Sequence, residues 1–272
     1  MKLDLHLHTT ASDGAWCPAA VVQGAAKGGL DVISITDHDT VAGVRSAQEA
    51  ARDLRVHIVP GIEISSTYGR ADVHVLGYFV DLDSDALRRH GESAGRRRVD
   101  RMKEMVERLK TQGVDVSYEA VVEAAGPDGV VIGRPHLAKA LVERGHATSV
   151  WDAFDRLIGD DHDAFVPTHL LEPADAVELV LAAGGIPVWA HPPAELVDGL
   201  LPTLIEAGLR GLEVYRPRPK RSQVLRLESI CKTTGLLMSG GSDWHSPDRG
   251  SALGDFYVNA DEIEGLLHQG GL

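Results

Sequence analysis

Short apolar runs rich in β-branched residues alternate along the chain with longer amphipathic stretches. The runs expected to form strands are Lys2–His6, Val32–Thr36, Val56–Ile64, Val73–Val80, Ile186–His191, Gly211–Tyr215 and Leu236–Gly241. The stretches expected to form helices between them include Pro18–Lys27, Val41–Leu54, Pro173–Ala183, Glu195–Ala207 and Pro219–Thr233. This alternation predicts successive strand–helix units and a mostly parallel sheet that closes, or nearly closes, into a barrel.

The stretch from residue 84 to residue 165 breaks this rhythm, because its pattern is helical throughout. The helices expected there are Ser84–Gln112, Tyr118–Ala125, Arg134–Arg144 and Val150–Leu157, joined by turns such as Gly126–Gly129. We therefore expect an α/β protein in which residues 1–83 and 166–272 form the barrel. Residues 84–165 are expected to form a helical insertion that stands over one end of the barrel.

The composition narrows the class of protein. No run of about eighteen apolar residues occurs, so no membrane-spanning helix is expected. The first residues lack the basic and apolar regions of a secretory signal. With only Cys17 and Cys231, far apart in the chain, neither a disulfide framework nor a cysteine zinc site is expected. Together these observations predict a reduced, cytoplasmic protein.

The net charge of −13 argues against broad electrostatic binding of nucleic-acid backbones. An anionic substrate is compatible with this charge if bound cations reverse its sign locally. The basic cluster of Arg96, Arg97, Arg98, Arg101 and Lys103 lies in a helical stretch that also contains glutamates. We expect this cluster to form a solvated helix face with i,i+4 ion pairs, and a binding patch is the alternative.

The stretch "DLHLHTTASDG" near the start of the chain carries the first candidate chemistry. Because side chains alternate along a strand, His6 and His8 share one face, while Leu5 and Leu7 share the other. A histidine pair at this spacing can bind a metal ion, or it can face solvent on an edge strand. The pair alone does not decide between these interpretations, since a metal site needs further ligands.

Further histidine, aspartate and glutamate residues follow predicted strands elsewhere in the chain. They are Asp37 and His38 in "ITDHDT", Glu63 in "GIEIS", His191 in "AHP", and Asp243 and His245 in "SDWH". His74 in "DVHVLGY" is the exception, since it comes early in its run. The carboxyl ends of the strands carry the chemistry of α/β barrels, so these residues predict one functional rim. The remaining histidines do not share this placement, and most are expected at the surface or in packing, at positions 57, 90, 136, 146, 162, 169 and 268.

These motifs, "HLH…SDG", "TDH", "GIE", a lone histidine, "AHP" and "SDWH", occur in the order and with the spacing of a known family. The chain resembles the PHP (polymerase and histidinol phosphatase) family over nearly its whole length. The resemblance implies a distorted (β/α)7 barrel and a trinuclear metal centre with nine ligands. One ion would be held by His6, His8, Glu63 and Asp243, the second by a bridging Glu63 with His74 and His191, and the third by Asp13, His38 and His245. Asp13 stands where some relatives use histidine.

The donor set of this centre indicates the kind of metal. Six imidazoles and three carboxylates without a thiolate suit Mn²⁺, Fe²⁺ or Zn²⁺ better than Ca²⁺ or Cu⁺. We expect three divalent ions, with Mn²⁺ first and Fe²⁺ or Zn²⁺ as alternatives. The ions would outweigh the charge of the carboxylates, so the centre would be cationic within an acidic protein. A hydroxide that bridges two ions about 3.5–4 Å apart would be the nucleophile, and the ions would hold the phosphoryl oxygens.

Basic residues outside this centre indicate a second anion site. In "IGRPHLAKAL", Arg134 and His136 stand at the start of a predicted helix, where an anion can be held. Arg216 and Arg218 in "EVYRPRPKR" follow a predicted strand. The alternatives are a solvent-exposed arginine at the helix start and a solvated loop after the strand. We take Arg134, His136 and Arg216 as the substrate-binding candidates, so the insertion would contribute to the substrate pocket.

The "RPH" stretch resembles the stand-alone PHP phosphoesterases that act on nucleoside 3′,5′-bisphosphates. The resemblance implies a metal-dependent phosphomonoesterase that removes the 3′-phosphate to leave a 5′-nucleotide, with trimming of short RNA from its 5′ end as a related activity. Arg216 stands where such relatives commonly have histidine, which leaves the phosphate contacts open. The expected partner is a small phosphorylated nucleotide, and neither a membrane nor an obligatory protein partner is expected.

Three alternative interpretations stay open. A different phosphatase of the family, such as a histidinol-phosphate phosphatase, would be distinguished by a panel of substrates. A noncatalytic PHP module that stabilises a partner is disfavoured, because such modules often lose ligands and this chain keeps all nine. An amidohydrolase acting on C–N bonds is disfavoured as well, because no lysine suited to carbamylation ends a predicted strand.

Overall fold

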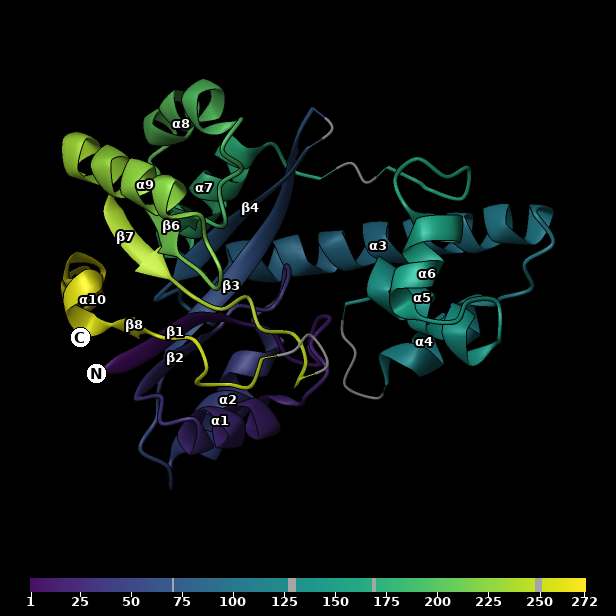
Figure 1. The fold of residues 1–272 in the computed structure, drawn as a ribbon, viewed down its shortest axis with the longest axis horizontal. Coiled ribbons are helices and arrows are strands. Elements are labelled where there is room, and N and C mark those ends of the chain that lie inside the picture. The colour runs from purple at the N-terminus through teal and green to yellow at the C-terminus, as the bar shows by residue number, and fades with distance from the viewer. Residues whose placement is uncertain (70, 127–130, 168–169, 248–250) are drawn as a thin grey trace.

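The computed structural model describes residues 1–69, 71–126, 131–167, 170–247 and 251–272 (Figure 1). In this part of the chain the strands are β1 (Lys2–Leu7), β2 (Val32–Ile35), β3 (His57–Tyr68), β4 (Ala71–Tyr78), β5 (Ile186–Trp189), β6 (Gly211–Tyr215), β7 (Leu237–Gly240) and β8 (Val258–Asn259). The α-helices are α1 (Pro18–Lys27), α2 (Ala42–Ala51), α3 (Asp85–Thr111), α4 (Tyr118–Ala125), α5 (Arg134–Glu143), α6 (Val150–Ala153), α7 (Pro173–Ala182), α8 (Val197–Glu206), α9 (Arg221–Thr234) and α10 (Glu264–Gly270). The predicted turn at Gly126–Gly129 lies outside the described residues except for Gly126, and so does His169.

The strands form one sheet in the order β7-β6-β5-β4-β3-β2-β1-β8. Parallel pairing joins β1, β2 and β3 on one side and β5, β6 and β7 on the other. The segment after β7 returns to β1, where Leu7 and Trp244 form a parallel bridge and His8 donates its backbone N–H to the Trp244 carbonyl at 3.0 Å. The sheet is thereby nearly closed, which confirms the expected α/β barrel. The sequence pattern did not predict the short strand β8.

The pairing of β4 departs from the parallel arrangement, because β4 runs antiparallel to both of its neighbours. Together β3 and β4 form a hairpin whose register extends from Gly61 and Tyr78 to Tyr68 and Ala71. The sequence pattern placed no helix between the runs Val56–Ile64 and Val73–Val80, and none separates these two described strands. As a consequence, the first half of β4 lies at the same end of the barrel as the carboxyl half of β3.

Amphipathic helices cover the outside of the barrel. In α1, the residues Val21, Val22 and Ala25 are buried and pack in one cluster with β2, as expected for apolar positions three and four apart. On the other half of the sheet, Val177 and Val180 of α7 pack in a second cluster with residues of α8, α9 and the strands beneath. None of the described helices is long and apolar enough to cross a membrane.

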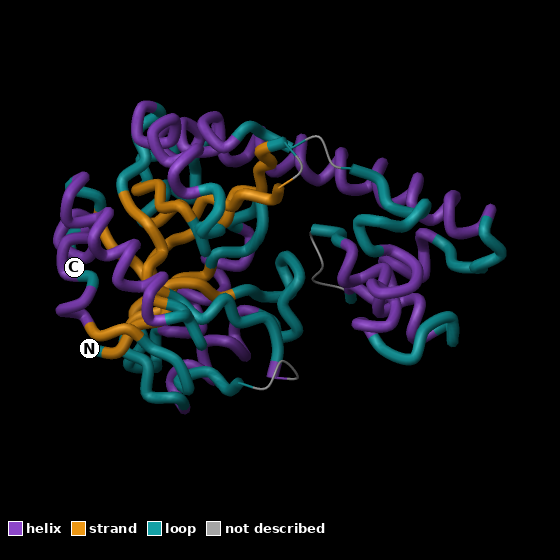
Figure 2. Tube along the Cα trace, turned by 45° about the horizontal axis from the view of Figure 1, so that its top comes forward, coloured by secondary structure: helices purple, strands orange, loops and turns teal. Residues whose placement is uncertain are grey.

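The insertion is carried by α3, a helix of 27 residues. Near its start Leu87 packs into the barrel core, whereas Met102, Met105 and Leu109 belong to a separate core with α4, α5 and α6. Figure 2 shows α3 running from the barrel to this group of helices. The predicted helical insertion is therefore present, and its boundary at residue 84 stays a prediction because α3 packs on both parts.

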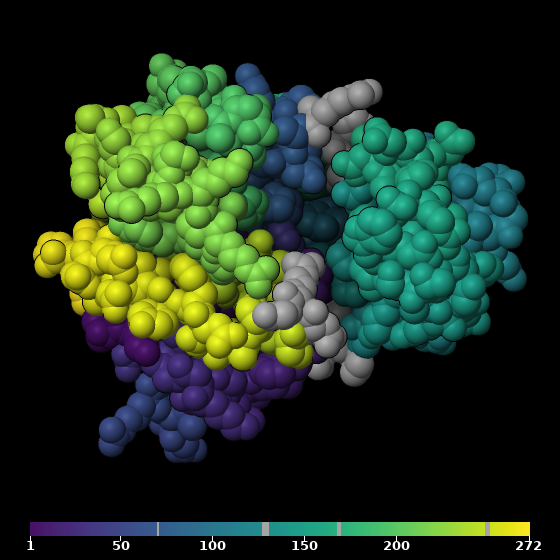
Figure 3. Space-filling view, in the orientation of Figure 1, coloured from purple at the N-terminus to yellow at the C-terminus, as the bar shows by residue number. Residues whose placement is uncertain are grey.

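The insertion and the barrel rim face each other across a hollow. The space-filling view shows this recess between the two parts (Figure 3). A cavity of about 520 Å³ lies there, and its lining comes from β3, β4, α3 and the insertion. A cavity of this size is in the range that holds a small ligand.

Candidate metal centre

Nine ionisable side chains meet at one rim of the barrel. They are His6 on β1, His8 directly after β1, Asp13 in the loop that follows, His38 after β2, Glu63 on β3, His74 on β4, His191 after β5, and Asp243 and His245 after β7. The structure brings all nine ligand candidates from the sequence together.

Glu63 lies at the centre of this cluster and is almost completely buried. Its Oε2 atom lies 3.4 Å from His6 Nε2, 3.2 Å from His8 Nε2 and 3.2 Å from His38 Nδ1. Its Oε1 atom lies 3.0 Å from His74 Nδ1 and 3.2 Å from His191 Nε2. Each carboxylate oxygen thus faces its own set of nitrogen donors, which is the arrangement that a carboxylate bridging two cations requires.

The donor atoms fall into three overlapping groups that could each hold an ion. One group contains His6, His8 and Asp243, a second contains His38, Glu63 and His74, and a third contains His8, Asp13, His38 and His245. The first and third groups contain most of the ligand sets implied by the resemblance. The second group contains His38 where the resemblance implies His191. His191 nevertheless lies close to Glu63, with its Nε2 atom 3.2 Å from Oε1.

The loop that carries Asp13 is held by Asp37, a buried carboxylate that is not part of the cluster. Asp37 accepts hydrogen bonds from the Thr9 backbone N–H at 2.7 Å, the Thr9 hydroxyl at 2.7 Å and the Ser12 hydroxyl at 2.6 Å. Because both oxygens of Asp37 are engaged, its role in "TDH" is to order the "HTTASDG" loop. His38, the next residue, faces the cluster instead.

The antiparallel direction of β4 explains how His74 reaches the rim. Across the hairpin, His74 pairs in register with Ser65, two residues beyond Glu63 on β3. In a parallel strand, an early position would lie at the opposite end of the barrel. His74 therefore reaches the rim from an early position in its strand because β4 runs antiparallel to β3.

The backbone at the rim adopts uncommon conformations. His191 has a φ of 30° and Asp243 a φ of 54°, so both non-glycine residues lie in the left-handed region. Such conformations are unfavourable by about 1–3 kcal/mol each and persist where surrounding contacts enforce them. At Gly241 a Cβ atom would collide with the Cβ atom of His6, so the chain after β7 can approach β1 only with glycine there.

Several buried atoms of the cluster lack hydrogen-bond partners among the described residues. They are His6 Nε2, both ring nitrogens of His8, and Glu63 Oε2. A buried polar atom without a partner costs about 1–3 kcal/mol, so the arrangement is unfavourable without a further group. Lone pairs of nitrogen and oxygen that converge from several sides fit divalent cations, and this fit makes the cluster a candidate metal centre.

The charges in the cluster favour ionised carboxylates. Burial opposes ionisation of Glu63, but the neighbouring His38, His6 and His74 hold the pKa of its carboxyl well below the ordinary value. Burial likewise opposes ionisation of Asp243, and His6 and His8 lower the pKa of that carboxyl well below its usual range. Ionised carboxylates are the form that binds a metal ion.

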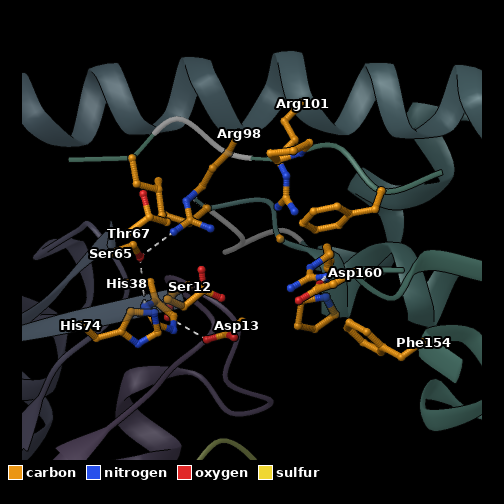
Figure 4. Close-up of a pocket in the computed structure, with 18 of the residues that line it drawn as sticks. Ser12, Asp13, His38, Ser65, Thr67, His74, Arg98, Arg101, Phe154 and Asp160 are labelled. Carbon is orange, nitrogen blue, oxygen red and sulfur yellow. Dashed lines mark hydrogen bonds and ion pairs between the residues drawn. The ribbon is translucent and has the colours of Figure 1, made fainter. Parts of the chain in front are cut away.

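The cavity beside the cluster joins it to a second group of charges. Asp13, His38 and His74 form part of its lining, and Arg98, Arg101 and Arg134 form another part (Figure 4). The first three belong to the barrel rim, whereas Arg98 and Arg101 come from α3 and Arg134 from the first turn of α5. One cavity therefore contacts both a candidate metal centre and a wall of three guanidinium groups, which we call the arginine wall.

Each arginine of this wall is held in a different way. Arg98 donates to the Ser65 hydroxyl at 2.9 Å, and Arg101 Nε donates to the Val166 carbonyl at 2.7 Å. Arg134 pairs with Asp160, and its guanidinium carbon lies 5.0 Å from the ring centroid of Phe165. Burial lowers the pKa of Arg101, and the nearby positive charges of Arg134 and Arg98 lower it further. An anion bound beside these groups would relieve this repulsion.

Comparison with known proteins identifies the family. The PHP domain family model matches residues 4–158, which is more than half of the chain. The chain belongs to the PHP family.

Curated relatives of this PHP chain have different activities. A 5′-3′ exoribonuclease of Haemophilus influenzae is 31% identical over 271 residues, which cover 98% of this chain and 97% of the relative. A 3′,5′-nucleoside bisphosphate phosphatase of Chromobacterium violaceum is 29% identical over 255 residues, which cover 92% of this chain and 89% of the relative. A solved structure from Bifidobacterium adolescentis, named provisionally as a metal-dependent phosphoesterase, matches with a TM-score of 0.88 and 31% identity over 98% of this chain and 96% of that one. The PHP chain is accordingly a phosphoesterase, a class of hydrolase.

The substrate candidates from the sequence are not all brought to the cavity of this PHP protein. Arg134 lines it. His136 is buried, and its Nδ1 accepts the backbone N–H of Gly133 at 3.0 Å, which caps the start of α5. Among the described residues that line the cavity, neither His136 nor Arg216 is found, so a substrate contact by either one stays a prediction.

The interpretation of the α3 basic cluster as a solvated face is wrong for two of its members. Arg98 and Arg101 line the cavity, whereas Arg96 and Lys103 are exposed. The sequence holds a signal for this difference, because positions 98 and 101 are three apart and share one helix face. This spacing does not indicate which face of α3 packs against the barrel.

Proposed function

We propose that this PHP phosphoesterase removes the 3′-phosphate of nucleoside 3′,5′-bisphosphates and releases 5′-nucleotides. The observation that carries the proposal is one cavity lined both by three members of the nine-residue cluster, Asp13, His38 and His74, and by the arginine wall. A substrate with two phosphates needs two sites of positive charge. One would be supplied by bound cations and the other by the arginines.

The metal ligands in this proposal are the nine residues of the cluster. His6, His8, Glu63 and Asp243 would hold one ion, Glu63 with His74 and His191 the second, and Asp13, His38 and His245 the third. The nitrogen and oxygen donors fit three Mn²⁺ ions, with Fe²⁺ or Zn²⁺ as alternatives. Bound divalent ions would activate water and neutralise the phosphoryl oxygens.

The arginine wall would hold the 5′-phosphate. Charge-assisted bonds from guanidinium groups to phosphate are strong and directional. Arg101 is the best placed for this role, because its charge has no carboxylate partner among the ion pairs of the described residues. Arg98 shares its charge with Asp39, and Arg134 shares its charge with Asp160, so both would bind more weakly.

A second candidate function is the removal of nucleotides from the 5′ end of short RNA. The exoribonuclease of Haemophilus influenzae, which is similar over almost the whole chain, favours it. In a 5′-phosphorylated RNA, release of the first 5′-nucleotide breaks the bond between the 3′ oxygen and phosphorus, as in a 3′,5′-bisphosphate. The two substrates differ only in whether the attacked phosphate carries a second ester. The negative net charge of the chain disfavours long RNA.

The test is a substrate panel with Mn²⁺-loaded protein. Adenosine 3′,5′-bisphosphate should yield AMP and phosphate with a higher kcat/KM than 3′-AMP, p-nitrophenyl phosphate or histidinol phosphate. A 5′-phosphorylated dinucleotide measures the exoribonuclease activity in the same assay, because its cleavage releases AMP without free phosphate. If the bisphosphate were hydrolysed no better than p-nitrophenyl phosphate, the proposed function would be refuted.

A further inference from the structure

Glu213 of β6 is a fully buried carboxylate that touches two members of the cluster. Its Oε1 atom lies 2.8 Å from Nδ1 of His6, and its Oε2 atom accepts the backbone N–H of His191 at 2.7 Å. Glu213 belongs to none of the groups of side chains that could hold an ion in the described structure. It therefore lies behind the cluster, on the side away from Glu63.

The contact with His6 decides which ring nitrogen faces the cluster. A carboxylate oxygen accepts hydrogen bonds, so the contact fits His6 donating its Nδ1–H to Oε1 of Glu213. In the neutral imidazole that binds a metal ion, Nε2 of His6 would then carry the lone pair, and this atom lies 3.4 Å from Glu63 Oε2 and 3.5 Å from Asp243 Oδ1. A histidine whose other nitrogen donates to a carboxylate is fixed in orientation and is a more basic ligand.

The contact with His191 fixes a strained backbone. The φ of His191 is 30°, a conformation that non-glycine residues adopt only where contacts enforce it. The second oxygen of Glu213 holds the N–H of that same residue. In this conformation Nε2 of His191 lies 3.2 Å from Glu63 Oε1, the oxygen that faces away from His6.

From these two contacts we infer that Glu213 is a positioning residue for metal binding, and that it orients one ligand on each side of the bridging Glu63. The inference rests on the proposed function, in which His6 and His191 hold different ions. Glu213 would touch neither metal nor substrate, and it would act through these two histidines. The alternative is that Glu213 only stabilises the fold and has no effect on metal binding.

The first experiment compares Mn²⁺ binding by wild type and the Glu213→Gln variant. Glutamine keeps the size of the side chain but replaces one accepting oxygen by an NH₂ group, so it cannot accept from both partners. The matched control is Glu228→Gln on α9, which contacts Tyr215 of the same strand at 3.2 Å from outside the barrel. Metal-free proteins are titrated with Mn²⁺ by calorimetry, and their thermal unfolding is recorded without metal.

We expect Glu213→Gln to weaken Mn²⁺ binding about 10- to 100-fold, the usual effect of losing a carboxylate behind a metal-bound histidine. The unfolding temperature without metal should stay close to that of wild type, and Glu228→Gln should bind Mn²⁺ normally. Unchanged Mn²⁺ affinity in Glu213→Gln overturns the inference.

A second variant covers the case in which Glu213→Gln does not fold. Glu213→Asp keeps the negative charge but shortens the side chain, so it reaches one partner at most, and an intermediate loss of affinity supports the inference. If neither variant folds, Glu213 is a residue of the core and the inference is overturned. A wild-type protein that binds no Mn²⁺ would refute the proposed function itself, which separates the two failures.

Discussion

The guanidinium of Arg98 on α3 lies 2.5 Å from Oδ2 of Asp39, the residue that follows His38 at the barrel rim. Asp39 is buried and also accepts hydrogen bonds from His90 Nε2 and from the Ser65 backbone N–H, both at 2.9 Å. Arg98 donates in addition to the Ser65 hydroxyl, which lies 3.4 Å from His38 Nδ1. The insertion is thus joined to the rim through the Asp39 carboxylate and the Ser65 hydroxyl, and the arginine wall has a defined position beside the cluster.

Removal of the metal should abolish activity. We expect gently purified protein to contain close to three divalent ions per chain by elemental analysis, because eight of the nine residues form three groups that could each hold an ion. Chelation should reduce hydrolysis of the bisphosphate to background, and added Mn²⁺ should restore it. Full activity in protein shown to be free of metal would contradict the proposed mechanism.

Glu63 should be essential, because it contacts donors through both of its oxygens. The Glu63→Gln variant is expected to lose activity to background and to bind fewer Mn²⁺ ions than wild type, as measured by calorimetry and elemental analysis. His57→Ala is the control, since His57 is exposed at the other end of β3. Equal losses in the two variants would mean that Glu63 has no special role.

Arg101 should determine the preference for two phosphates. Loss of a charge-assisted bond is worth about 1.5–3 kcal/mol, so Arg101→Gln should lower kcat/KM for adenosine 3′,5′-bisphosphate by about 10- to 100-fold. The value for p-nitrophenyl phosphate should change little, because that substrate has no second phosphate. The measured quantity is the ratio of the two kcat/KM values.

Arg96→Gln provides the matched control for this ratio, because Arg96 is exposed on the same helix. The ratio should stay at the wild-type value in Arg96→Gln. Arg134→Ala should give a smaller change than Arg101→Gln, since Asp160 already neutralises part of its charge. If the ratio of the two kcat/KM values did not change in Arg101→Gln, the arginine wall would have no role in substrate recognition.

The two cysteines should differ in their reactivity with pH. Cys17 is exposed, whereas Cys231 is buried and burial raises its pKa to about 11. Only the thiolate reacts, and at pH 8 a thiol with this pKa is about 0.1% ionised. Iodoacetamide at pH 8 should therefore label Cys17 alone, and labelling of Cys231 should increase as the pH rises towards 11. Mass spectrometry of the native protein measures both, with unfolded protein as the control that labels both sites.

The identity of the cluster could be predicted from the sequence because its determinants are local. Histidine and carboxylate residues recur where apolar runs end, and parallel strands bring their carboxyl ends to one rim. The alternation of Leu5 and Leu7 with His6 and His8 likewise depends only on the period of a strand. The full set of nine was implied by the resemblance to the PHP family, and all nine meet in the fold.

The features that the sequence did not determine depend on contacts between distant segments. His74 reaches the rim only because β4 runs antiparallel, and an apolar run has no signal for its direction. Arg98 and Arg101 face the cavity because α3 packs across the rim, while the helix pattern alone allowed any face to meet the barrel. Glu213 resembles an ordinary strand residue in sequence, and its place behind His6 comes from the closure of the barrel. Local periodicity sets which residues share a face, but only long-range packing decides what that face contacts.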